Sequence, residues 1–224
     1  MSDARAAILG RLRASGEPGP LPSPLPALDT AVLERCQWPP AERVARLRKG
    51  MEAVHTEFLD ATPDTWPNLV RAFCDREELK NLLYGPTSED GAVLTATWLP
   101  DGTQLMPYDR PVEAFKRELF TGVDAGFTGT VGGVAETGGL LLTPGPAEPR
   151  LLSLVPPIHI ALLRTSTIQD SFWSAVQTLG WGRSLPPNAL LISGPSKTAD
   201  IEQTLAYGVH GPRRLIVVLV DDLA

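Results

Sequence analysis

The chain has 224 residues, of which 43% are hydrophobic and 21% are charged, and its formal net charge is -6 at pH 7. This length suits one substantial hydrophobic core, and the acidic balance argues against a nucleic-acid partner, because phosphate binding needs a clustered basic face. No apolar run approaches the roughly 20 residues that cross a bilayer. The first residues also lack the apolar centre of a secretory signal, so we expect a cytoplasmic protein without a membrane span.

The two cysteines, Cys36 and Cys74, stand alone in the sequence. Neither belongs to a Cys-x-x-Cys pair, and no histidine lies at ligand spacing from either of them. Zinc and iron-sulfur sites draw on several such ligands, and a disulfide framework draws on several cysteines. The sequence therefore predicts no metal site and no disulfide framework in this chain.

Residues 1–37 are predicted to form an arm that precedes the core. Residues 2–14 suit a short amphipathic helix, and residues 16–26 read GEPGPLPSPLP. Proline fixes φ and lacks an N–H, so this stretch is incompatible with helix or strand and is typical of an extended tether. Residues 38–224 are then expected to form the folded domain, with two helices ahead of an α/β core.

The first of these helices is predicted from apolar residues that recur at three- and four-residue spacing after Trp38: Val44, Leu47, Met51, Val54 and Phe58. Its other face is charged and is typical of a solvated helix face, with an anion-binding patch as the alternative; it carries Glu42, Arg43, Arg46, Arg48 and Lys49. Thr62-Pro63 predicts the N-cap and first turn of a second helix near residues 64–73. Two helices are thus expected before any strand.

From residue 92 onward, short apolar runs alternate with helix-like segments. The expected strands are 92–98, 139–142, 158–163, 189–193 and 215–220, and the expected helices are 112–119, 168–179 and 199–207. Continuous apolar runs suit strands that are covered on both faces. Ser166-Thr-Ile-Gln169 has the spacing of a capping box at one helix start. The alternation predicts an α/β fold with a largely parallel sheet flanked by helices.

Residues 192–202, ISGPSKTADIE, are the first candidate for a binding site. In a parallel α/β sheet, ligands bind at loops that leave the carboxyl ends of strands, near the free amides of helix N-termini. The polar groups here that suit a phosphate or carboxylate are Ser193, Ser196, Lys197, Thr198 and Asp200. In the alternative interpretation, Thr198 caps a helix, Asp200 lies in its first turn and Lys197 points to water.

Residues 126–142, GFTGTVGGVAETGGLLL, are the second candidate. Gly132, Gly133 and Gly138, with Thr137, let the backbone approach a ligand closely, and Glu136 lies among them in a neighbourhood expected to be buried. Glu136 is interpreted either as a catalytic base or nucleophile or as a carboxylate that loop amides hold in place.

The histidines differ in their surroundings. His210, in the loop GVHGP at 208–212, is expected to face a cleft, whereas His159 lies within an apolar run and is expected to be a core residue. No Ser-His-Asp order and no His-Glu-x-x-His motif is visible in the sequence.

Four segments carry a resemblance to a known family: GGVAETG at 132–138, RLLSLVPPIH at 150–159, SGPSKTADIE at 193–202 and GVHGP at 208–212. Together, and in this order, they resemble the LUD-domain family and its lactate-utilisation protein C branch, over roughly residues 43–220. The resemblance implies an α/β fold of the NagB/RpiA/CoA-transferase-like type, here with an N-terminal helical extension. It also implies a role in oxidising L-lactate to pyruvate, in a three-protein system whose other members carry iron-sulfur clusters. The expected cofactors are therefore none in this chain and iron-sulfur clusters in its partners.

The leading hypothesis from the sequence is a non-cluster subunit that binds an anionic small molecule or a partner at a cleft between the Glu136, 193–200 and 208–212 loops. In this hypothesis, Glu136 or His210 is the base for a hydroxyl proton and Lys197 anchors a carboxylate. Two alternatives stay open. One is an independent acyl or CoA transferase or sugar-phosphate enzyme, because Glu136-Thr-Gly resembles the nucleophile setting of CoA transferases. The other is a non-catalytic docking subunit whose loops form a protein interface.

Overall fold

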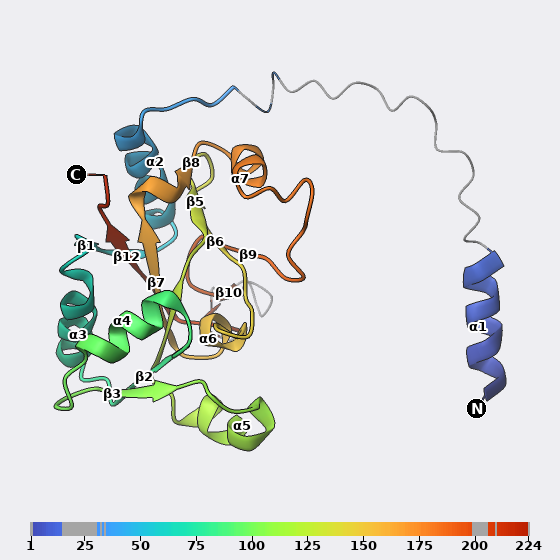
Figure 1. The fold of residues 1–224 in the computed structure, drawn as a ribbon, viewed down its shortest axis with the longest axis horizontal. Helices are drawn as coiled ribbons and strands as arrows, with labels where there is room; N and C mark the ends of the chain where they lie inside the picture. The colour runs from blue at the N-terminus through green and yellow to red at the C-terminus, as the bar shows by residue number, and fades with distance from the viewer. Residues whose placement is uncertain are drawn as a thin grey trace. The chain divides into compact units, whose positions relative to one another are not determined.

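The computed structural model describes residues 2–14, 31, 33, 35–198, 206–208 and 210–223 (Figure 1). The chain divides into two units, Met1–Leu33 and Glu34–Ala224. The first unit contains α1 (Ser2–Ala14), the helix expected there, and the expected proline-rich tether lies outside the described residues. No helix in the described part of the chain is long and apolar enough to cross a membrane.

The centre of the second unit is a six-stranded sheet in the order β1-β12-β7-β4-β2-β3. Every pairing in it is parallel. Its strands are β1 (Glu57–Ala61), β2 (Asn81–Tyr84), β3 (Gln104–Pro107), β4 (Ala125–Gly129), β7 (Ile158–Arg164) and β12 (Arg214–Val220). The predicted α/β fold with a largely parallel sheet is confirmed.

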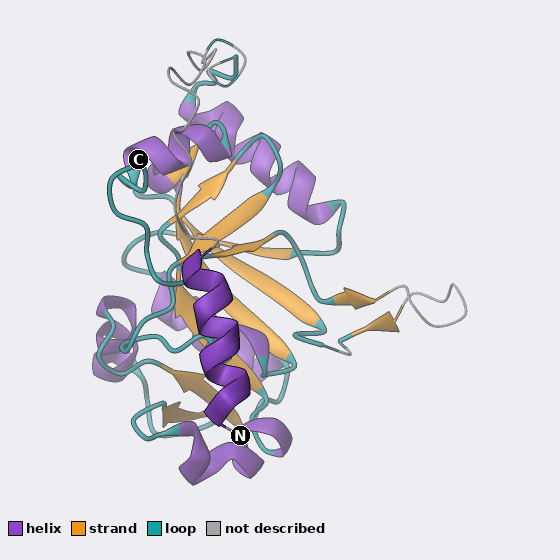
Figure 2. Ribbon diagram, turned by 90° about the vertical axis from the view of Figure 1, so that its right-hand side faces the viewer, coloured by secondary structure: helices purple, strands orange, loops and turns teal. Residues whose placement is uncertain are grey.

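A second sheet has four strands in the order β8-β5-β6-β9. They are β5 (Gly132–Val134), β6 (Gly139–Leu142), β8 (Ile168–Gln169) and β9 (Leu190–Ile192). β6 pairs antiparallel with both β5 and β9. A separate antiparallel pair, β10 (Lys197–Thr198) and β11 (Ala206–Tyr207), projects from the main body as the two short strands on the right of Figure 2.

The inner strand β12, which lies between β1 and β7, explains how the layers are held together. Its residues Ile216, Val218 and Val220 join the apolar cluster that contains α3 (Trp66–Arg76) and α4 (Glu89–Thr97). Its alternate residues, Leu215, Val217 and Leu219, join the cluster that contains α2 (Pro40–Glu52) and the second sheet. Successive side chains of a strand point to opposite faces, so both faces of β12 are buried and its sequence is continuously apolar.

The remaining helices cover the sheet near β2 and β4 or follow the second sheet. Leu83 of β2 and the helices α5 (Val112–Thr121) and α6 (Leu151–Leu154) form one apolar cluster. The 3-10 helix η1 (Thr165–Thr167) follows β7, and α7 (Phe172–Thr178) packs near β5 through a smaller cluster that contains Val134, Ala175 and Trp181. Helices therefore flank the parallel sheet, as the sequence predicts.

The first predicted helix is shorter than its apolar spacing suggests. Leu47 and Met51 are buried on α2, but the helix ends at Glu52, and Phe58 belongs to β1. His55 has a φ of 69°, which turns the chain between them. The prediction of two helices before any strand is wrong, because β1 lies between α2 and α3.

Residues 92–98 are expected as a strand, but residues 92–97 belong instead to helix α4, and Trp98 is its C-cap. Ser88 is its N-cap and accepts a hydrogen bond from the Gly91 amide at 3.1 Å, and two carboxylates occupy the first turn. The helix expected over residues 168–179 is also shorter, because Ile168 and Gln169 form strand β8 and α7 begins only after Ser171. Ser171 and Ser174 form the capping box there, in place of the one predicted at Ser166.

The last expected helix, 199–207, is not supported where the structure describes the chain. Residues 199–205 lie outside the described residues. The residues on either side, Lys197–Thr198 and Ala206–Tyr207, pair as antiparallel strands. The polar segment 193–198 therefore leads into a hairpin strand and not directly into a helix.

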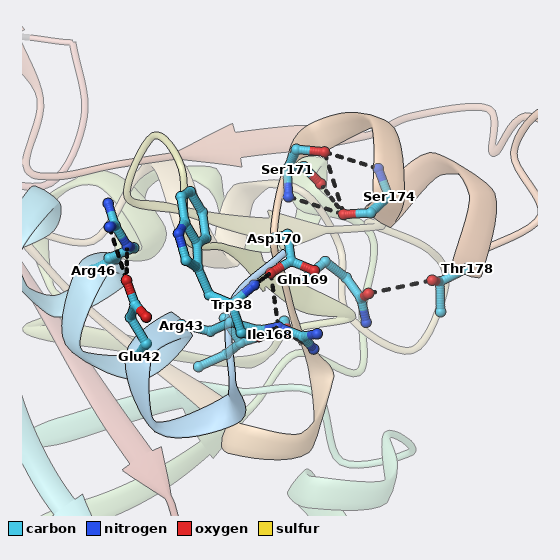
Figure 3. A network of polar contacts seen from close by, with 10 residues as sticks. All are labelled: Trp38, Glu42, Arg43, Arg46, Ile168, Gln169, Asp170, Ser171, Ser174 and Thr178. Atoms are coloured by element: carbon cyan, nitrogen blue, oxygen red, sulfur yellow. Dashed lines mark hydrogen bonds and ion pairs between the residues drawn. The ribbon is translucent and has the colours of Figure 1, made fainter. Parts of the chain in front are cut away.

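The start of α2 is fixed to the second sheet by Asp170 (Figure 3). Its Oδ1 accepts hydrogen bonds from the Trp38 amide at 2.7 Å and from Arg43 Nε at 3.0 Å. Arg46 pairs with Glu42 at 2.8 Å and lies over the ring of Trp38. These arginines are engaged within the chain, which favours a structural interpretation of this helix face over an anion-binding patch.

Candidate functional site

The order of strands has a switch point between β2 and β4. After β2 the chain adds β3 on one side, and from β4 it continues through β7 and β12 on the other. Ligands of open α/β sheets bind outside the carboxyl ends of the strands at such a point. A cavity of about 210 Å³ lies there, and we call it the switch-point cavity. Its polar lining includes Ser88, Asp90, Thr128, Thr130, Thr143, Glu148 and Arg164.

An ion pair forms part of the wall of this cavity. Asp90 lies in the first turn of α4, and its side chain is 9% exposed; Arg164 is the last residue of β7. The Arg164 Nη2 donates to Asp90 Oδ1 at 2.6 Å. This hydrogen bond raises the pKa of Arg164, so the guanidinium stays charged within the ion pair.

A second carboxyl group, that of Glu148, accepts hydrogen bonds from the Gly129 amide at 3.0 and 3.1 Å. Burial raises the pKa of Glu148, and the hydrogen bonds from Gly129 and Ser88 oppose that shift. A Cβ on Gly129 would lie 2.8 Å from Asp90 Oδ2 and 3.7 Å from Glu148 Oε1. The missing side chain thus lets β4 end between two carboxyl groups with different environments.

A second cavity, of about 150 Å³, lies at the opposite ends of the strands, near the amino ends of β7 and β12; we call it the amino-end cavity. It is lined by Ser153, Leu154, His159, Ile192, Gly194, Ser196, His210, Gly211, Pro212 and Leu215. These residues come from three of the four segments that carry the family resemblance, 150–159, 193–202 and 208–212, together with Ile192 and Leu215. The last two segments are joined through the backbone, because Ser196 N donates to Pro212 O at 2.8 Å and Gly208 N donates to Ser196 O at 3.0 Å.

The place of the 193–200 loop differs from the expectation. The loop follows β9, which pairs antiparallel with β6 in the second sheet, so the expectation that it leaves the carboxyl end of a parallel strand is wrong. Ser196 and His210 line the amino-end cavity together. Asp200 and the side chain of Thr198 lie outside what the structure describes.

Lys197 and Ser193 line a neighbouring cavity of about 240 Å³, together with residues 53–55 at the end of α2. The two cavities share Gly194. The Ser193 carbonyl accepts a hydrogen bond from Thr56 Oγ1 at 3.0 Å, which ties the loop to the start of β1. Lys197 is exposed, so its ammonium group is available to solvent beside this cavity.

His159 connects the walls of the switch-point and amino-end cavities. The residue is 1% exposed, and its Nε2 lies 2.9 Å from Oγ1 of Thr128, which lines the switch-point cavity. Its Nδ1 has no hydrogen-bond partner among the residues that the structure describes. Burial lowers the pKa of His159 to about 3, so the ring is neutral at physiological pH. His159 also lines the amino-end cavity, and a buried ring nitrogen without a partner is a group that a ligand can complete with a hydrogen bond.

Glu136 lies apart from these cavities. It occupies the turn between β5 and β6, is exposed, and accepts a hydrogen bond from Arg35 Nη2 at 2.8 Å. Its amide donates to the Asp170 carbonyl at 2.9 Å. Neither Glu136 nor its exposed neighbour Thr137 lines any of the cavities described here. The structure therefore separates Glu136 from Ser196, Lys197 and His210.

The glycines beside Glu136 are explained by close packing. A Cβ on Gly133 would lie 2.5 Å from Leu47 Cδ1 on α2, and one on Gly132 would lie 2.7 Å from the Thr167 carbonyl oxygen. Gly138 has a φ of 66°, and a Cβ there would lie 2.9 Å from the backbone of Gly50. These positions let α2 and η1 approach the β5–β6 hairpin, and they place no backbone amide at a described cavity.

Several residues of the switch-point cavity are not identified by the alternation of apolar runs and helix-like segments in the sequence. The signal lay in the segment NLLYGPTSED at 81–90, in which a short apolar strand precedes a helix cap. Reading 92–98 as a strand hides this strand-loop-helix unit, and with it Ser88 and Asp90. Among the described residues, no group of three or more histidine, cysteine or acidic side chains is arranged to hold a metal ion.

Comparison with known proteins identifies the family. The LUD domain model matches residues 44–220. An uncharacterised protein of Neisseria meningitidis serogroup B is 41% identical over 184 residues, which cover 80% of this chain and 77% of the relative. A lactate utilization protein C of an Exiguobacterium species is 30% identical, over 76% of this chain and 74% of the relative. A lactate utilization protein C 1 of Bacillus mycoides is 28% identical, over 81% and 80%.

The fold has a solved counterpart as well. The crystal structure of a DUF162 family protein from Deinococcus radiodurans matches with a TM-score of 0.61 over 82% of this chain and 99% of that one. Its sequence identity is 20%, so this likeness supports the fold alone. From the match over residues 44–220 and the relatives above, the chain belongs to the LUD-domain family, and its resemblance to the lactate utilization protein C branch is confirmed.

Proposed function

We propose that this chain takes part in lactate utilisation, as a cytoplasmic component of a system that oxidises L-lactate to pyruvate together with iron-sulfur partner proteins. The relatives named lactate utilization protein C, which align over about three quarters or more of the chain, support this role. The structural observation that carries the proposal is the meeting of three family-like segments at the amino-end cavity. Segments that are distant in sequence and line one cavity are suited to shared recognition of a ligand.

In this proposal the partners carry the electrons. The chain contains two cysteines, whereas an iron-sulfur cluster is typically held by four ligands, usually cysteine thiolates. Cys74 is buried in the apolar core, and burial raises its pKa to about 12, so its sulfur stays protonated. Cys36 and Cys74 therefore do not form a cluster site, and the chain's contribution is to bind a substrate, a product or a partner.

We place the proposed anionic ligand at the amino-end cavity and the adjoining Lys197 loop. His159 is neutral, so its Nδ1 can donate to a carbonyl or accept from a hydroxyl, according to its tautomer. Ser196 and His210 line the same cavity, and Lys197 provides a positive charge at the adjoining one. A small 2-hydroxy or 2-oxo acid combines the groups that these side chains complement.

The transferase alternative has weaker support. A carboxylate nucleophile needs access to its substrate and donors for the developing oxyanion. Glu136 pairs with Arg35 and lines none of the described cavities, and the described contacts give it no such donors. The docking alternative makes the same loops a protein surface, and the following experiment distinguishes it from ligand binding.

The first test is genetic and biochemical. A strain that lacks this chain should fail to grow on L-lactate and should grow normally on glucose, and a tagged copy should restore growth and co-purify with iron-sulfur proteins. Normal growth on L-lactate, with the tagged chain recovered alone, would contradict the proposed role. In calorimetry, Lys197→Ala should weaken binding of L-lactate or pyruvate, whereas Lys116→Ala, an exposed lysine on α5, serves as the control. Growth on lactate that depends on the chain, without binding of either acid, would favour the docking subunit.

A further inference from the structure

The switch-point cavity has no part in the proposed lactate chemistry, yet it has the features of a ligand site. Its volume of about 210 Å³ is several times the roughly 30 Å³ that one water molecule occupies in the liquid. Three strands contribute to it at their carboxyl ends, because Gly129 ends β4, Leu142 ends β6 and Arg164 ends β7. The cavity is thus held by the rigid part of the fold.

The charges around this cavity disfavour an anion. Glu89, Asp90 and Glu148 line it against one cation, Arg164. The Arg164 guanidinium already donates to Asp90 at 2.6 Å, so it is compensated within the wall. A carboxylate or phosphate ligand would meet two more acidic groups and no uncompensated cation among the described lining residues. Lactate, pyruvate and sugar phosphates are therefore poor matches for this site.

The hydrogen-bonding groups favour a ligand that has several donors. Carboxyl oxygens are mainly hydrogen-bond acceptors, and an ionised carboxylate offers about four lone-pair sites. Gly129 and Ser88 occupy some of those of Glu148, and Arg164 occupies some of those of Asp90. Threonine hydroxyls at 128, 130 and 143 can each donate or accept. A molecule with several hydroxyl groups can satisfy acceptors and donors at once.

We propose that the switch-point cavity is a second ligand site that binds a small uncharged molecule with several hydroxyl groups, and that its occupancy is transmitted to the amino-end cavity through the Thr128–His159 hydrogen bond. Thr128 has one hydroxyl hydrogen. When it donates to His159 Nε2, the ring proton is on Nδ1; when it donates to a ligand, Nε2 carries the proton and donates to Thr128. The ligand thus selects whether Nδ1 presents a donor or an acceptor to the amino-end cavity.

Solution NMR on the isotope-labelled full chain tests the site. Glycerol, erythritol and D-ribose are titrated separately, with sodium L-lactate as the anionic comparison. We expect at least one of the three polyols to shift the Gly129 and Thr130 amide signals in a saturable manner, and L-lactate to leave them unchanged. Glu148→Gln should weaken that binding about tenfold, the loss of roughly one charged hydrogen bond, whereas Glu118→Gln on the exposed face of α5 should not. Unshifted Gly129 and Thr130 signals with all three polyols, or saturation by L-lactate, would overturn the site.

The connection has its own readout in the same experiment. The imidazole nitrogen shifts of His159 report the tautomer, and we expect the bound polyol to change them in the wild-type chain but not in Thr128→Val. An unchanged His159 ring in a polyol-saturated sample would overturn the connection and leave the site itself intact. These signals do not depend on lactate binding or on partner proteins, so failure of the proposed function would be seen separately.

Discussion

Gly126 supports the helix that carries Ser153, a residue that lines both the switch-point and amino-end cavities. A Cβ on Gly126 of β4 would lie 2.2 Å from the Leu152 carbonyl oxygen and 2.9 Å from Pro156 Cγ. Close carbon–oxygen contacts in proteins are about 3.3 Å or longer, so Gly126→Ala would force α6 away from the sheet by about 1 Å. Leu152 is fully buried, and its packing would be disturbed by this movement.

The expected cost follows from overpacking. Extra carbon atoms in a well-packed core destabilise by about 1–3 kcal/mol, and the rigid backbone contact places Gly126→Ala near the upper end. Gly182→Ala is the matched control, because no described heavy atom lies within 4 Å of a Cβ built there. Both substitutions restrict the unfolded chain equally, by about 0.4–1 kcal/mol. The difference between the two variants therefore measures the clash in the folded state.

Urea unfolding followed by tryptophan fluorescence, with thermal unfolding as a second measure, gives that difference. One kcal/mol corresponds to a shift in Tm of about 2–4 °C for a domain of this size. We expect Gly126→Ala to unfold at least several degrees below Gly182→Ala. Free energies of unfolding that agree within about 0.5 kcal/mol, the usual scatter of independent sites, would refute the account of how α6 packs on β4.

Three further outcomes are expected. A double-mutant cycle with Asp90→Asn and Arg164→Gln should give a coupling free energy of about 1–3 kcal/mol, because the charged atoms of Asp90 and Arg164 lie 2.6 Å apart and Asp90 is nearly buried. A coupling free energy near zero would contradict this ion pair in the wall of the switch-point cavity. Burial lowers the pKa of His159 to about 3, so between about pH 6.5 and pH 3 the unfolded chain binds a proton at this ring and the folded chain does not. The free energy of unfolding therefore falls by about 1.4 kcal/mol for each pH unit that the pH is lowered in this range. His159→Gln should flatten this slope in acid unfolding curves, and an unchanged slope would contradict the burial of the ring. A thiol reagent at pH 8 should modify Cys36 and spare Cys74 in the folded chain, because burial raises the pKa of Cys74 to about 12; rapid modification of both would show that Cys74 is accessible.

The fold was predictable from the sequence where an element is buried on both faces, because such an element has a recognisable apolar sequence. Residues 160–163 of β7 and 215–220 of β12 are continuous apolar runs because helices or strands cover both faces of these strands. Helix α4 was not predictable from 92–98 alone, because the valine, threonines and tryptophan of this segment favour strand. What starts the helix is the cap at Ser88 and the acidic first turn, which precede that window.

The candidate sites depend on contacts that local patterns do not contain. Thr128 and His159 are 31 positions apart in the sequence, yet the parallel register of β4 and β7 brings their side chains together. Ser196 and His210 could be named from their loops, but the cavity that they share requires the pairing of backbones at Ser196, Gly208 and Pro212. The glycine-rich surroundings of Glu136 predict a ligand site, but these glycines instead let α2 pack closely against the β5–β6 hairpin.

The open edges of the parallel sheet bear on how this chain behaves when concentrated. β1 and β3 are the outermost strands, and an outer strand can recruit a strand from another molecule and begin aggregation. β3 is four residues long and ends in Pro107, which has no N–H to offer. β1 carries two carboxylates, Glu57 and Asp60, on a five-residue strand. Glu57 pairs with Arg214 and Asp60 pairs with Arg48. A strand from another molecule would have to pack beside these charged side chains, which disfavours pairing at this edge.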